Sequence, residues 1–123
     1  MTRPPGPGVR DPERGAGTIL ALGLAFAVVL GVGACALVAE GFASAARAAL
    51  AADLAALIGA DAERGLRAGP ACGAAGEVAR LNGAELVACE IERPGQVVRV
   101  RVRVSAPPPL DAVEGRARAG APP

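Results

Sequence analysis

The longest hydrophobic pattern in the chain is an uncharged run from Gly15 to Ala39, bounded by Arg14 and Glu40. A helix rises about 1.5 Å per residue, so a run of this length is enough to cross a hydrocarbon core of about 30 Å. The apolar part of a secretory signal is usually only about 7–15 residues long. The pattern therefore predicts one transmembrane helix over residues 15–39, with residues 1–14 as a leader before it.

The arginines around the run predict its orientation. Arg3, Arg10 and Arg14 precede it, whereas only Arg47 lies close behind it. Because basic residues are retained on the cytoplasmic side of a membrane helix, we expect the N-terminus in the cytoplasm and the C-terminal domain outside. The predicted localisation is thus the cell membrane, with a single pass.

Small side chains recur at every fourth position of the run. They are Gly23, Ala27, Gly31, Cys35 and Ala39. Such a stripe lets a second helix approach closely, so we interpret it as a helix-packing face. The letters "VGAC" at Val32–Cys35 also fit a lipobox, but the apolar stretch continues past the cysteine. We therefore favour Cys35 as a small apolar helix residue over a lipidated one.

The helical pattern continues beyond the membrane, over residues 40–66. This stretch is rich in alanine and contains no proline, which favours one unbroken helix. The apolar residues Leu50, Leu54, Leu57 and Ile58 follow a helical spacing and predict an amphipathic extension. We expect this leucine stripe to pack on the strands that follow, the alternative being that it packs on neighbouring subunits and leaves the hairpin poorly ordered in a lone chain.

Residues 70–104 predict a short helix and a β-hairpin. The helix is expected at residues 71–81, followed by an Asn-Gly turn, and the strands show alternating apolar positions around "RPGQ". A two-residue loop at Pro94-Gly95 would set Ile91 opposite Val98, Cys89 opposite Val100, Val87 opposite Val102 and Glu90 opposite Arg99. A four-residue loop keeps this parity and a three-residue loop inverts it, so the loop length stays open.

Two cysteines flank the predicted short helix, Cys72 and Cys89. In an extracytoplasmic domain this small we expect them to form a disulfide, the alternative being two free buried thiols. The arginine row at positions 99, 101 and 103 is interpreted as a solvated strand face. Residues 105–123, rich in proline, glycine and alanine, are expected to be a disordered tail.

Composition narrows the function further. The chain of 123 residues has a net charge of +1, no histidine and only two serines, Ser44 and Ser105. This gives no case for nucleic-acid binding, and no signature of a catalytic, metal, cofactor or small-molecule site. The predicted fold class is α+β: a long membrane helix that extends into an amphipathic helix, then a short helix and a hairpin.

Three segments between Glu13 and Val104 resemble a known family: "ERGAGTILALGLA", "AADLAALIGA" and the Cys-helix-"NGAELVAC"-hairpin arrangement. They are similar to the TadE/TadG-like pseudopilins of Flp-type (tight-adherence) pilus loci, in particular to the short actinobacterial TadE-like proteins encoded near helicase and secretion genes. The resemblance implies a pilin-like membrane subunit that associates with other pilin-like or secretion-platform subunits. A membrane-anchored envelope scaffold protein, unrelated to pili, is the alternative.

The resemblance also points to a cleavage site. Pilins of this kind are usually cut after a glycine, which would be Gly15 here and would leave Ala16 as the new N-terminus. The fifth residue after the cut is normally glutamate, but this chain has Leu20. We therefore favour an uncleaved accessory subunit over a processed and polymerised one.

Overall fold

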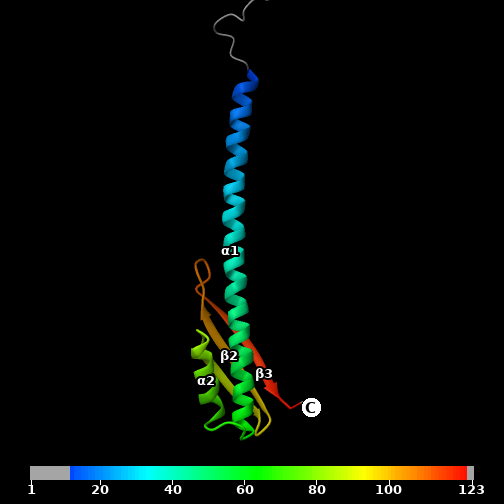
Figure 1. The fold of residues 1–123 in the computed structure, drawn as a ribbon, viewed down its shortest axis with the longest axis vertical. Coiled ribbons are helices and arrows are strands. Elements are labelled where there is room, and N and C mark those ends of the chain that lie inside the picture. Colours follow the sequence, from blue (N-terminus) through cyan, green and yellow to red (C-terminus); the bar gives the residue numbers. More distant parts are fainter. Residues whose placement is uncertain (1–11, 122–123) are drawn as a thin grey trace, which may run out of the picture. The chain divides into compact units, whose positions relative to one another are not determined.

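The computed structural model describes residues 12–121, which form two helices and one sheet (Figure 1). In chain order the elements are α1 (Pro12–Glu63), α2 (Ala71–Leu81), β1 (Glu85–Arg93), β2 (Val97–Ser105) and β3 (Ala112–Gly120). The predicted α+β class is confirmed, and so is the continuation of the apolar helix into the following stretch. Residues 1–11, most of the predicted leader, lie outside the described residues.

The chain divides into two compact units, residues 1–37 and residues 38–123. The first unit contributes the N-terminal half of α1. The second unit holds the rest of α1, together with α2 and the three strands. The core, the disulfide and the sheet all belong to this second unit.

The sheet is antiparallel with the strand order β1-β2-β3, so it has one strand more than the sequence predicted. The expectation of a disordered tail is wrong for Ala112–Gly120, which pairs along the whole of β2. In β3 the inward positions Val113, Ala117 and Ala119 pack against the core, and charged residues stand between them. This alternation supplies the apolar face that a third strand needs.

The hairpin pairs largely as predicted, but by a different route. Ile91 lies opposite Val98, Cys89 opposite Val100 and Glu90 opposite Arg99, which confirms these three pairs. The loop has three residues, 94–96, and the register shifts between Ile91 and Arg93. The loop has one residue more than a two-residue turn, which shifts the pairing by one position. The extra residue Glu92 in β1 shifts it back, so the same residues face inward as predicted.

A second irregularity corrects the fourth predicted pair. The register shifts again between Leu86 and Ala88, and Val102 faces Leu86 instead of Val87. Leu86 packs against the buried core from this position. The extra residue at Val87 therefore moves the inner face of β1 by one position at its start.

The turn of the hairpin follows the expected chemistry of Pro-Gly. The Gln96 amide donates to the Arg93 carbonyl oxygen at 2.9 Å, and Gly95 has a φ of 77°. A positive φ at the third position of a turn after proline is typical of type II. The amide of Gly95 also donates to the Glu63 carboxylate at 2.9 Å, which ties the turn to the end of α1.

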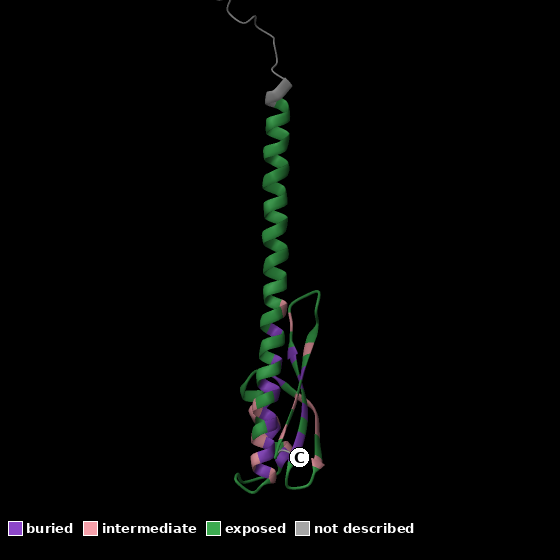
Figure 2. Ribbon diagram, turned by 90° about the vertical axis from the view of Figure 1, so that its right-hand side faces the viewer, coloured by how far each residue is buried: buried purple, intermediate pink, exposed green. Residues whose placement is uncertain are grey.

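The core joins small side chains of the helices to the valines of β2. Figure 2 shows the buried positions gathered beside the sheet, at the end of the long helix. Its α1 contribution is an alanine face, made of Ala48, Ala51, Ala52, Ala55, Ala56, Ala60 and Ala62. The predicted leucine stripe does not have this role. Leu50 and Leu57 are more than half exposed, and Leu54 and Ile58 are half-buried but do not belong to the core or to the residues packed against it. The expectation that this stripe covers the hairpin is therefore wrong.

The reason for this correction is the close approach of α1 to the sheet. An ideal Cβ on Gly115 in β3 would lie 2.1 Å from the carbonyl oxygen of Ala48, and one on Gly59 would lie 3.2 Å from Val98 Cγ1. Backbones this close leave room for alanine and glycine, but not for leucine. Leu50 and Leu57 consequently remain exposed.

The helix α2 also packs through alanine side chains. Its buried residues Ala71, Ala75 and Ala79 are spaced four apart and form one face. The helix ends at the predicted Asn-Gly turn, where the Asn82 side chain donates to the Val78 carbonyl oxygen at 2.8 Å and Gly83 has a φ of 72°. The sequence-based bounds of this helix are confirmed.

Candidate functional site

The apolar half of α1 has no cover from its own chain. All residues from 15 to 40 are exposed, among them Ile19, Leu22 and Phe26 with 64–72% of their surface accessible. Within the described residues, α1 is the one helix long and apolar enough to cross a membrane. Its exposed apolar surface indicates a single-pass anchor, because lipid would replace water around it.

The predicted helix-packing stripe lies on this exposed segment. Gly23, Ala27, Gly31, Cys35 and Ala39 are all exposed, and an added Cβ at Gly23 or Gly31 would meet no other atom of the described chain within 4 Å. Gly15 and Ala16, the candidate cleavage pair, also lie in α1 and are exposed. The stripe is thus open to a second helix.

Cysteine chemistry in the second unit follows the prediction. Cys72, at the start of α2, is joined to Cys89 of β1 with a Cα–Cα distance of 5.8 Å. Cys35 is free and exposed. The disulfide joins α2 to the sheet, and Cys35 remains as a free thiol in the apolar half of α1.

Arginines dominate the sheet face opposite the helices. Arg99 lies directly across from Arg118, and Arg101 from Arg116, while Arg103 faces Glu114. Like charges directly opposite each other on neighbouring strands are destabilising. This face therefore depends on acidic residues between the arginines.

Glu92 is the acidic residue that holds one of these arginine pairs together. Its carboxylate accepts from Arg118 and forms ion pairs with both Arg118 and Arg99. The hydrogen bond from Arg118, followed by the nearby positive charges, holds the pKa of Glu92 below its ordinary value, although partial burial opposes this. Sequence reasoning missed this residue, because its role depends on the irregularity in β1 and on a third strand that was not predicted.

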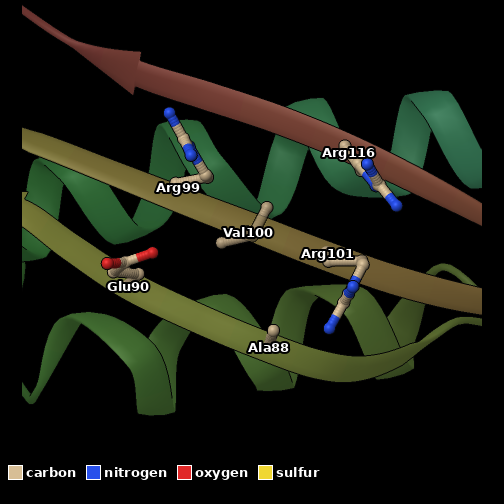
Figure 3. A pocket seen from close by; sticks show the side chains of 6 residues that line it. All are labelled: Ala88, Glu90, Arg99, Val100, Arg101 and Arg116. Atoms are coloured by element: carbon tan, nitrogen blue, oxygen red, sulfur yellow. The ribbon is translucent and has the colours of Figure 1, made fainter.

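A shallow hollow of about 270 Å³ lies on the same face, where Ala88 stands opposite Arg101 (Figure 3). Glu90, Arg99 and Arg116 line it as well. Among the described residues Arg101 has no ion pair, whereas Arg116 lies 3.9 Å from Glu114. The short side chain of Ala88 accounts for the hollow, and the exposed, mostly paired arginines agree with a solvated face.

The described residues hold no group of three histidine, cysteine, aspartate or glutamate side chains that could bind a metal ion. The described residues present an exposed apolar helix with one free thiol on it. No family model, curated protein or solved structure matches this chain.

Proposed function

We propose that this chain is a TadE-like minor pseudopilin or accessory membrane subunit of a Flp-type (tight-adherence) pilus or a related secretion system. Its N-terminus lies in the cytoplasm and its second unit lies outside the membrane. One observation carries the proposal: within α1 (Pro12–Glu63) the uncharged residues 15–39 are all exposed, whereas the end of the same helix packs against its own sheet. A subunit that associates with others through a membrane helix needs both parts.

The outward leucines of α1 support an assembly role. Leu50 and Leu57 keep 57% and 53% of their surface exposed, and Phe42 keeps 73%. Burying a leucine side chain contributes roughly 1.5–3 kcal/mol, so a lone subunit forgoes much of this stabilisation. A neighbouring helix packed on these residues would recover it.

The disulfide supports the proposed topology. Disulfides persist in oxidising compartments and are rare in the cytosol. The pair Cys72–Cys89 therefore favours an extracytoplasmic second unit, in agreement with the arginines that precede the apolar run. A periplasmic reporter fused after residue 123, which leaves β3 intact, should be active. Activity of a cytoplasmic reporter at the same position would contradict this orientation.

Cross-linking through Cys35 tests the assembly role in native membranes. The other two cysteines are bonded to each other, so a thiol-specific cross-linker reacts with the chain at Cys35. We expect covalent products that contain a pilin-like or platform subunit, identified by mass spectrometry. The matched control replaces Cys35 with alanine and Leu37 with cysteine, which moves the thiol about 200° around the helix.

The outcomes separate the hypotheses. Strong products from Cys35 and weak ones from Leu37→Cys would support a specific helix–helix contact. Equal yields from both would refute a specific face, and partners unrelated to pili would favour an envelope scaffold. Mass spectrometry of the intact protein should find an uncleaved chain, whereas an N-terminus at Ala16 would indicate processing as a pilin, and a lipidated Cys35 a lipoprotein.

A further inference from the structure

The loop between β2 and β3, residues 106–111, lies beside α1 near the end of the uncharged run. An ideal Cβ on Gly41 would lie 3.8 Å from Leu110 Cδ1, and Pro107 lines a surface hollow together with Glu40, Ser44 and Arg47 of α1. All these residues belong to the unit 38–123. Gly41 follows Ala39, the last residue of the uncharged run, by only about 3 Å along the helix. The fold thus holds this loop at the level where α1 leaves the apolar run.

The backbone of the loop is suited to a poorly hydrated environment. Pro107, Pro108 and Pro109 have no amide hydrogen. The amide of Leu110 donates to the Pro107 carbonyl oxygen at 3.1 Å, and the amide of Ala106 donates to the Asp111 carbonyl oxygen at 3.2 Å. Every backbone N–H from 106 to 110 is therefore absent or bonded within the loop. Transfer out of water leaves none of these donors unsatisfied.

The side chains of the loop have the same character. Residues 106–110 read "APPPL", without charge, and Leu110 keeps 48% of its surface exposed at the loop's end. Phe42, which follows Gly41, and Val38, three residues before Gly41, are exposed as well. The charged residues Glu40 and Asp111 flank the apolar positions, as expected where hydrocarbon gives way to lipid headgroups.

We propose that the loop 106–110 enters the interfacial layer of the membrane, with Leu110 at the boundary between headgroups and acyl chains. This inference rests on the membrane anchor of the proposed function. The loop then gives the second unit a second contact with the bilayer. This contact restricts the rotation of the unit about α1 and so determines which of its surfaces face neighbouring proteins. Because the loop is uncharged, the contact requires no anionic lipid.

A single tryptophan tests this placement, since the chain contains no tryptophan or tyrosine. The full chain carrying Leu110→Trp is reconstituted into phosphatidylcholine vesicles whose acyl chains are brominated either near the headgroup or near the bilayer centre. We expect blue-shifted emission, a large loss of emission with the shallow bromine and a small loss with the deep bromine.

Two further variants make the result interpretable. Leu66→Trp is an exposed position just beyond the end of α1, about 33 Å along the helix from Gly41, and should keep its emission in both lipids. Leu30→Trp lies in the apolar run and should be quenched by the deep bromine. Hydrogen exchange of β3 checks that each variant retains the fold.

The outcomes are distinct. If Leu30→Trp is quenched and Leu110→Trp is not, the anchor stands and the loop proposal is wrong. If neither is quenched, the anchor fails and the loop proposal fails with it. Equal quenching of Leu110→Trp and Leu66→Trp would show a unit lying flat on the membrane. A blue shift at Leu110→Trp without bromine quenching would show that protein covers the loop. Both of these results overturn the proposal.

Discussion

Replacing Gly115 with alanine tests the contact between β3 and α1, which the sequence did not predict. An ideal Cβ at this position lies 2.1 Å from the carbonyl oxygen of Ala48 and 2.4 Å from its carbonyl carbon. The new methyl group must retreat by about 1.3 Å from the carbonyl oxygen to reach an ordinary contact of about 3.4 Å. Because the obstacle is helix backbone, no side-chain rotation can relieve it, and either β3 or α1 has to move.

The expected loss of stability follows from two opposing terms. Overpacking of a well-packed core costs roughly 1–3 kcal/mol, and a clash with backbone belongs at the upper end. Replacing glycine by alanine within an element returns about 0.5–1 kcal/mol. The net destabilisation is therefore about 2 kcal/mol. In a domain of this size each kcal/mol lowers Tm by about 4–8 °C, so we expect Tm to fall by roughly 8–16 °C.

Thermal unfolding of the full chain in detergent micelles, followed by circular dichroism, measures this shift. Hydrogen exchange of the peptide that covers β3 shows whether the strand is protected. The matched control is Gly76→Ala in α2, where the added carbon meets Leu86 at an ordinary 3.5 Å and helix propensity improves. It should melt at or above the wild type. A Gly115→Ala protein that melts with the wild type, together with unprotected β3 amides, would refute the third strand.

Three further changes probe the disulfide, the faces of α1 and the outer surface of the sheet. Replacing Cys72 and Cys89 with serine should cost about 3 kcal/mol, and the reduced wild type should melt with this variant; unchanged melting would deny the disulfide a stabilising role. Ala55→Leu should lower the free energy of unfolding by roughly 1–3 kcal/mol, because Ala55 is fully buried. Leu57→Asp should lower it less, because Leu57 is half exposed. If Leu57→Asp melts at the lower temperature of the two, the leucines form the inner face of α1. Glu92→Gln should lower stability at neutral pH. Because Arg118 lowers the pKa of Glu92, the carboxylate stabilises the fold above its unfolded pKa, and the difference in Tm between wild type and variant should shrink as the pH falls below about 4. A constant difference would mean that its charge is irrelevant.

The hairpin can be predicted because the alternation of apolar and charged residues determines its inward face whatever the exact length of the loop. Valines alternate with arginines through β2, so a shift of one residue would expose its whole apolar face. The pair Ile91–Val98 forms with a two-residue loop, and equally with a three-residue loop plus one extra residue at Glu92. The apolar pattern fixes which residues face inward, but it does not distinguish these two routes.

The third strand was missed because its residues have low strand propensity. Its inward positions are Val113, Gly115, Ala117 and Ala119, and alanine and glycine are depleted in strands. Prolines just before it made the segment look like a tail. The pattern that indicates this strand is the strict alternation of small residues with Glu114, Arg116 and Arg118. These three charged residues lie opposite the three arginines of β2.

On α1 the alanines are buried against the sheet, whereas Leu50 and Leu57 are exposed. Hydrophobicity alone ranks leucine above alanine for burial, which is why the leucines were expected to face the sheet. Close backbone approach at Gly59 and Gly115 reverses the order, because only small side chains fit there. Each buried alanine removes less apolar surface from water than a leucine would, so a core built in this way is thin, and the disulfide between α2 and β1 compensates for part of the difference. Leu50 and Leu57 remain exposed on the same helix that carries the apolar run. The assembly that we propose would bury these leucines and so add the apolar contact that the thin core lacks.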